Sequence, residues 1–234
     1  MNVGMMQPYL FPYLGYFQLL NAVDVFIFAD DVNFIKGGFI SRNKILFKNE
    51  EYFITVPCMK KSQNKLINEV YLSTKTKGYP NNILLTIKQA YAKAPFFTDV
   101  FPIIESIFRS DIDSICTLAA SSVEIVSKYL EIDVDFKFSS VSFNHTKGQE
   151  KSIRLINITK DLGGTTYINP IGGTTIYEKK CFENQGIKLK FLEPEFIPYA
   201  QFNDNFVSKL SIIDVLMFNS IEGVNKLLNK YSLI

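Results

Sequence analysis

The chain has 234 residues, of which 47% are hydrophobic and 21% are charged, and its formal net charge is +2. This length and apolar content are enough for one large domain with a well-filled core. The small net charge argues against a nucleic-acid-binding surface, and no stretch reaches the roughly 20 apolar residues of a membrane span. We therefore expect a single α/β domain over residues 1–234, with a helical subregion at about 80–131.

The cysteines indicate the cellular compartment of the protein, and the single histidine limits the metal sites that it could form. The cysteines are odd in number and form no CxxC pair, which favours free thiols in the cytoplasm. Because His145 is the only histidine, a multi-histidine zinc site is excluded, and we predict no metal site. Residues 1–20 are apolar, but no basic residue precedes Lys36, so we expect folded protein there rather than a secretory leader.

The first 31 residues predict a βαβ unit. An apolar strand at 2–6 is followed by a loop at 7–15 that is too rich in proline and glycine to be regular. A helix is predicted at 16–23, and the apolar run at 24–31 predicts a buried strand that ends in two carboxylates. Because such a crossover favours parallel pairing, we predict a Rossmann-like, mostly parallel sheet flanked by helices.

The rest of the chain predicts a hairpin, a helical stretch and a return to alternating strands and helices. Apolar periodicity and proline or glycine breaks set the expected bounds. In chain order the predicted elements are strands at 44–47 and 52–57, helices at 81–93, 97–108 and 113–130, a strand at 135–140, a helix at 149–162, a strand at 166–169, a loop at 170–173, a helix at 176–184, a strand at 187–192, and helices at 211–218 and 221–231.

The loop after the first predicted strand is the first candidate binding segment. It contains Gln7, Tyr9, Tyr13, Gly15 and Tyr16 and lies where ligands dock in open α/β sheets, at the carboxyl end of a strand. Its aromatic side chains could stack on a flat ring, and its glycine would let a phosphate approach the backbone. The alternative is a proline- and tyrosine-rich loop that only packs.

The end of the second predicted strand is the second candidate segment. Asp30 and Asp31 end the strand, and Lys36 and Arg42 follow them. Close carboxylates can differ in pKa, which suits a general base, and the two cations suit a phosphate. The alternative is a turn with a structural ion pair.

A glycine-rich loop and an arginine complete the candidate site. Gly172 and Gly173 follow the short strand that contains Tyr167, and backbone amides in such a loop can hold a phosphate, although ordinary turns also contain glycine pairs. Arg154 is one of only three arginines, and arginine is preferred where phosphate or carboxylate is bound. Cys58 follows a strand end and is the cysteine to test as a nucleophile.

Together these segments resemble the WbqC-like protein family. The resemblance extends in the right order over nearly the whole chain, and its first motif is long and unusual. The matching segments are 7–17, Val25 to Arg42 around Asp30, Asp31 and Phe34, Thr55-Val56-Pro57, 87–95 with Tyr91, Arg154-Leu155-Ile156, Tyr167 with Gly172-Gly173 and Tyr177, Tyr199 with Gln201, and 210–214.

The resemblance implies an enzyme of bacterial surface polysaccharide biosynthesis. Family members occur in O-antigen and related gene clusters and look like glycyl or other aminoacyl transferases acting on amino sugars. The implied activity is N-acyl transfer to a nucleotide-activated amino sugar, with an activated acyl donor as second substrate. Asp30 or Asp31 would be the base, Lys36, Arg42 and the 172–173 amides would hold phosphate, and Tyr9 or Tyr13 would stack on a ring. The sequence does not identify a cofactor, and a homodimer is left open.

Two other functions stay open from the sequence. The opening βαβ unit is similar to that of nucleotidylyltransferases with an HxGH signature, which suggests nucleotidyl transfer or adenylate formation. However, Leu14-Gly15-Tyr16 stands where that signature would fall, and both histidines are absent. A non-catalytic sugar-nucleotide-binding protein of the same pathway is the third hypothesis.

Overall fold

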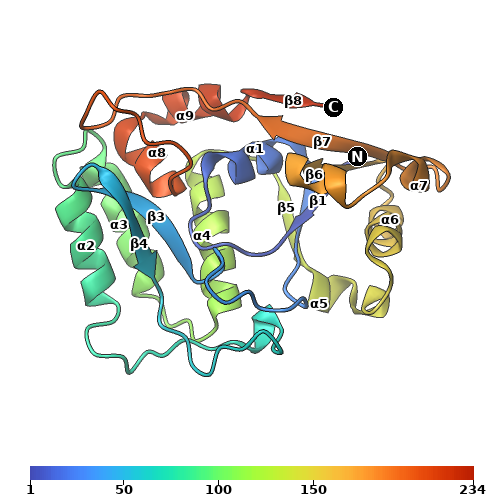
Figure 1. The fold of residues 1–234 in the computed structure, drawn as a ribbon, viewed down its shortest axis with the longest axis horizontal. Helices are drawn as coiled ribbons and strands as arrows, with labels where there is room; N and C mark the ends of the chain where they lie inside the picture. The colour runs from blue at the N-terminus through green and yellow to red at the C-terminus, as the bar shows by residue number, and fades with distance from the viewer.

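A six-stranded, mostly parallel sheet forms the centre of the computed structural model, which describes residues 1–234 (Figure 1). The strand order is β5-β2-β1-β6-β7-β8, and only β8 runs antiparallel to its neighbour. The strands are β1 (Asn2–Met6), β2 (Val25–Phe28), β5 (Asp135–Phe138), β6 (Thr166–Pro170), β7 (Lys188–Pro194) and β8 (Tyr231–Leu233). This sheet, with helices on both faces, confirms the predicted α/β class.

Alternating side chains divide the core between the two faces of the sheet. In β2, Phe26 and Phe28 point into the larger hydrophobic cluster, whereas Val25 and Ile27 belong to the smaller one. This is the period-two alternation of a strand that is covered on both faces. The helices α1 (Leu14–Ala22), α4 (Ile115–Tyr129) and α9 (Ile221–Leu228) contribute to the larger cluster, and α6 (Lys151–Asp161) and α7 (Lys179–Glu183) to the smaller.

A hairpin and three further helices extend the face of the sheet that α1 covers. Strands β3 (Arg42–Phe47) and β4 (Glu50–Thr55) form a separate antiparallel pair. Around it lie α2 (Asn81–Tyr91), α3 (Phe97–Phe108) and α8 (Ile212–Phe218) (Figure 1). The larger hydrophobic cluster includes residues of the sheet and of all three helices. None of the helices is long and apolar enough to span a membrane.

Several short elements depart from the bounds predicted from the sequence. The strand predicted at 24–31 is only the four residues of β2, so Asp30 and Asp31 follow the strand instead of ending it, and the helix predicted at 176–184 is confined to α7. The predicted strand at 135–140 ends early, because α5 (Ser139–Ser142) begins where the Asp30 carboxylate accepts the Ser140 amide. The predicted loop at 170–173 is the 3-10 helix η3 (Ile171–Thr175). The helix predicted at 221–231 ends at Leu228 as α9, and the chain then forms β8 along the edge of β7. Three residues are too few for the alternation of apolar and polar residues that would have predicted a strand. Two further 3-10 turns are η1 (Ile67–Glu69) and η2 (Asn144–Thr146).

Candidate functional site

The parallel sheet has a switch point between β1 and β6. From β1 the chain crosses through α1 to β2 on one side, and β6, reached from β5 through α6, lies on the other side. Since α1 and α6 cover opposite faces, they diverge at the carboxyl ends of β1 and β6 and leave a crevice there. Ligands of open α/β sheets bind in such crevices.

Two adjoining hollows occupy this crevice, and Met6 at the end of β1 borders both. We call the first the aromatic hollow, which encloses about 430 Å³; its walls include Tyr9, Tyr13, Phe39, Phe196 and Lys209. We call the second the polar hollow, which encloses about 270 Å³; its walls include Gln7, Lys151, Arg154, Tyr167, Asn169 and Tyr177. Three cations line the two hollows, and no carboxylate does.

The elbow at residues 10–11 fixes the aromatic wall. Phe11 has a φ of +41°, which is unfavourable for a residue with a side chain, and its ring is fully buried. Three distant elements hold this conformation. The Phe11 amide donates to Ser122 Oγ (2.9 Å), and its carbonyl accepts from Asn43 Nδ2 (2.8 Å) and Ser211 Oγ (2.7 Å). These hydrogen bonds keep the backbone of the elbow rigid, and this backbone positions Tyr9 and Tyr13 in the wall of the hollow.

Tyr16 and Gly15 support this wall from behind. Tyr16 is fully buried, and its hydroxyl donates to the Gln7 carbonyl over 3.0 Å, which ties α1 to the start of the loop. Gly15 lies in the first turn of α1, where an added Cβ would lie 2.4 Å from the ring of Tyr13 and 3.0 Å from Pro194. Neither lines a hollow in this arrangement, so both act on the site through their neighbours.

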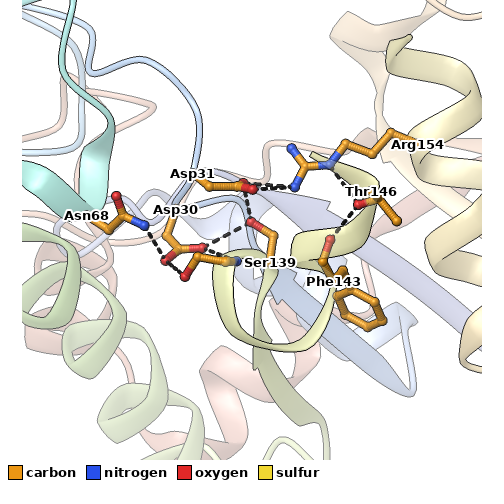
Figure 2. Close-up of polar contacts among 8 residues, drawn as sticks. Asp30, Asp31, Asn68, Ser139, Phe143, Thr146 and Arg154 are labelled. Atoms are coloured by element: carbon orange, nitrogen blue, oxygen red, sulfur yellow. Dashed lines mark hydrogen bonds and ion pairs between the residues drawn. The ribbon is translucent and has the colours of Figure 1, made fainter. Parts of the chain in front are cut away.

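The two carboxylates at the end of β2 are enclosed by protein donors (Figure 2). Asp31 accepts two hydrogen bonds from Arg154 Nη2, at 2.7 and 2.9 Å, and its side chain is only 1% exposed. Asp30 accepts the Ser140 amide (2.9 Å) and Asn68 Nδ2 (3.2 Å), and Ser139 Oγ lies between the two carboxylates. Every carboxylate oxygen of the pair thus has a partner, and both side chains are buried and line neither hollow.

Arg154 is the link between the carboxylates and the polar hollow. Its Nε donates to Thr146 Oγ1 over 3.2 Å and its Nη2 is bound by Asp31, whereas Nη1 has no partner within the protein. Figure 2 shows this third nitrogen without a contact among the residues drawn. Because Arg154 lines the polar hollow, Nη1 is available to an acceptor there. The buried ion pair fixes the direction in which the guanidinium points.

The first turn of α6 presents a second cation beside the first. Lys151 lies three residues before Arg154 on the same helical face, and both line the polar hollow. The helix amides themselves are already used, since the Glu150 carboxylate accepts from the amides of Ser152 and Ile153. These hydrogen bonds from backbone amides lower the pKa of the Glu150 carboxyl group. An anion in this hollow would therefore be held by side chains rather than by the helix N-terminus.

The remaining predicted residues lie at different distances from the crevice. Tyr167 is buried in the wall of the polar hollow and contacts Asn169 Oδ1 at 3.3 Å. Gly173 packs so closely on Asn169 that an added Cβ would lie 1.8 Å from its Nδ2, and Gly172 faces open space. Lys36 is exposed and lines neither hollow.

Arg42 is directed elsewhere. Its guanidinium lies 4.3 Å from the centre of the Phe53 ring and donates to the Gly37 carbonyl, so it holds the loop before β3 against the hairpin. The two other groups considered from the sequence are also engaged away from the crevice. His145 pairs with Asp161 at 2.8 Å on the surface, and burial raises the pKa of the Cys58 thiol to about 11.

Several wall residues were not predicted from the sequence. Lys151 could have been found, because it lies one helical turn before Arg154. Phe196 and Lys209 come from a segment without regular structure, and only the fold brings them to the elbow. Asn43 was overlooked because its role is to bind the carbonyls of Leu10 and Phe11, a contact between distant segments.

Comparison with known proteins agrees with the resemblance seen in the sequence. The chain is 23% identical over 221 residues to the uncharacterized protein Rv1507c of Mycobacterium tuberculosis, and the match covers 93% of each chain. No solved structure matches significantly. The model of the WbqC-like protein family matches residues 7–226, which include the elbow, the acidic pair and α6. The chain therefore belongs to the WbqC-like protein family.

Proposed function

We propose that the protein transfers an acyl group, glycyl or another aminoacyl, to the amine of a nucleotide-activated amino sugar, in the cytoplasm, for a bacterial surface polysaccharide. The observation that carries this proposal is the charge of the crevice. Lys151, Arg154 and Lys209 line it, no carboxylate does, and the chain as a whole is almost neutral. Such a crevice favours a ligand with a phosphate and an aromatic ring.

The polar hollow is the proposed diphosphate site. Arg154 Nη1 and the Lys151 ammonium would bind phosphate oxygens, and Asp31 would keep the guanidinium oriented during binding. In this role Asp31 is a positioning residue. That Asp30 or Asp31 takes a proton from the amine stays a prediction, and for it the amine would have to reach a buried carboxylate that lines neither hollow.

The aromatic hollow is the proposed site of the base or the sugar. Tyr9, Tyr13, Phe39 and Phe196 offer ring faces on which a planar or apolar surface can pack. The reaction itself joins the sugar nitrogen to the acyl carbon and breaks the bond from that carbon to its leaving group. The amine loses one proton, to the predicted base Asp30 or Asp31 or to the leaving group, and the leaving group departs with the bonding electron pair.

Mass spectrometry of the products tests the activity. Nucleotide-linked amino sugars are incubated with aminoacyl and other activated acyl donors, and the expected product has the mass of the amide. Arg154→Lys and Lys151→Ala should each raise the KM for the nucleotide sugar about tenfold or more, because each loses a charge-assisted hydrogen bond. Lys160→Ala is the matched control, since Lys160 lies on the same helix and binds Gln185 instead.

Two results would count against the proposal. One is the absence of any amide product across the panel, and the other is an equal change of KM in the Lys151 and Lys160 variants. Arg154→Lys is preferred to Arg154→Ala because it leaves a cation beside the buried Asp31, so that a loss of binding is not caused by an unpaired charge.

A non-catalytic sugar-nucleotide-binding protein is the second candidate. The observation that favours it is the complete hydrogen bonding of Asp30 and Asp31, which leaves no carboxylate exposed in the crevice. This function predicts that nucleotide sugars raise the melting temperature, as ligands of the folded state do, while no product mass is formed with any donor.

A further inference from the structure

The segment 195–210, which we call the strap, connects β7 to the N-terminal end of α8 and contains no helix or strand. In Figure 1 it is the orange-red stretch that runs from β7 towards α8. Despite its irregular backbone, the strap supplies Phe196 and Lys209 to the aromatic hollow. Lys209 has a φ of +57°, which is uncommon for a residue with a side chain. The outer wall of the hollow therefore depends on how this segment is held.

One carboxylate oxygen binds two side chains of the strap, in addition to the Glu195 amide bond to the Lys230 carbonyl and the packing of Ile197 and Val207 on the larger hydrophobic cluster. Tyr199 donates its hydroxyl hydrogen to Asp214 Oδ1 over 2.6 Å, and Gln201 Nε2 donates to the same oxygen over 2.7 Å. Gln201 also accepts the Val207 amide (2.8 Å) and donates to the Val207 carbonyl (3.1 Å), which closes the outer part of the strap into a loop. The bonds to Asp214 thus fix both the strap and its internal loop.

Asp214 is a buried carboxylate without a cationic partner, which is unusual in a protein core. Its side chain is fully buried in the first turn of α8, and no lysine, arginine or histidine pairs with it. Its other oxygen accepts the Tyr91 hydroxyl at 2.9 Å, and Tyr91 in turn accepts the amide of Leu46. A buried carboxylate without a cation is costly, and an apolar side chain would fill the space at less cost. The donors that converge on it indicate a purpose beyond packing.

We propose that Asp214, Tyr199 and Gln201 form a clasp that positions the strap, and that the clasp thereby sets the shape of the aromatic hollow and its affinity for the ring of the ligand. This inference rests on the proposed function only for the identity of that ligand. The clasp residues do not touch the ligand themselves. They are positioning residues that act through Phe196 and Lys209.

Two tyrosine variants separate this role from simple stabilisation. Tyr199→Phe and Tyr91→Phe each remove one hydroxyl donor from the same carboxylate, but only Tyr199 belongs to the strap. Both variants should lower the melting temperature. Only Tyr199→Phe should increase amide hydrogen exchange within 195–210 and raise the Kd for the nucleotide sugar, by about tenfold. Tyr91→Phe should leave both quantities within about twofold.

A fluorescent reporter makes the test independent of the ligand. The chain has no tryptophan, so Phe196→Trp places the single tryptophan of the variant on the strap at the hollow. Adding Tyr199→Phe to this variant should shift the emission to longer wavelength, and adding Tyr91→Phe should not. Unchanged emission and unchanged exchange in the Tyr199→Phe background would overturn the clasp. Equal changes in both backgrounds would also overturn it, because they would indicate general loosening.

The remaining outcomes distinguish the two proposals. If exchange and emission respond only to Tyr199→Phe but the wild type binds no nucleotide sugar, the proposed function fails and the clasp stands. If the wild type forms the amide product and binds a nucleotide sugar, and Tyr199→Phe loosens the strap without changing the Kd, the proposed function stands and the link from clasp to affinity is overturned.

Discussion

At the scale of single residues, the strained elbow shows how the site is made rigid. Phe11 adopts a left-handed backbone conformation that its side chain disfavours, and hydrogen bonds from Ser122, Asn43 and Ser211 hold it there. Asn43 has the largest share, since its amide nitrogen reaches the carbonyls of both Leu10 (2.9 Å) and Phe11 (2.8 Å). Strain of this kind persists only where the surrounding contacts over-determine it.

Replacing Asn43 with alanine should destabilise the protein and loosen the aromatic wall. The variant leaves two carbonyl groups without this buried donor, so we expect the free energy of unfolding to fall by about 2–4 kcal/mol. Urea titration monitored by circular dichroism measures the change. Asn21→Ala is the control, because Asn21 is exposed and donates only to Asn229. A loss below about 0.5 kcal/mol for Asn43→Ala would show that the elbow does not need this side chain.

At the scale of elements, Asp30 joins three segments that are far apart in the sequence. It lies two residues after the end of β2, accepts the Ser140 amide at the start of α5, and accepts Asn68 Nδ2 from η1. The sequence could show that two carboxylates follow a buried strand, but it could not show their partners. Those partners depend on the parallel pairing of β2 with β5, which places the end of β5 beside the end of β2.

Asp30→Ala distinguishes an anchor from a general base. As an anchor, Asp30 should contribute about 2–3 kcal/mol to the free energy of unfolding, because its removal leaves buried donors without acceptors. Chemical denaturation of the purified variant measures this contribution. Asp135→Ala, which removes an exposed carboxylate paired with Lys137, should change it by about 0.5 kcal/mol or less. Full stability of Asp30→Ala together with lost turnover would instead favour the base.

At the scale of the whole molecule, the sequence predicted the fold better than the site. The strand at 2–6 and the helix at 97–108 match the structure because hydrophobic periodicity is local. The crevice is not local, since its walls come from the elbow, α6, the hairpin region and the strap. Arg42 and Lys36 lie close to the acidic pair along the sequence, but the cation that pairs with Asp31 is Arg154, 123 residues away.

Buried tyrosines should make the folded state sensitive to alkaline pH. Burial raises the pKa of Tyr16, Tyr91 and Tyr167 well above 10.0. A pKa that is higher in the folded state favours folding while the phenol is protonated. This stability is complete below about pH 10 and is lost as the pH rises towards the folded-state pKa.

The unfolding free energy should therefore fall above pH 10, by about 1.4 kcal/mol per pH unit for each phenol that ionises only on unfolding. Urea titrations between pH 8 and 11.5 measure the slope. Tyr16→Phe removes one such phenol, so its slope should be shallower than that of the wild type. Identical slopes would mean that Tyr16 ionises equally easily in both states.

The antiparallel strand β8 affects whether the sheets of two molecules can pair edge to edge. It covers the outer edge of β7, where the Phe191 amide and carbonyl exchange hydrogen bonds with Ile234 over 2.9 and 3.0 Å. Without this cover, β7 would offer a row of unsatisfied donors and acceptors seven residues long. With β8 in place the outermost strand has three residues rather than seven, which shortens the edge on which a strand of a second copy could pair.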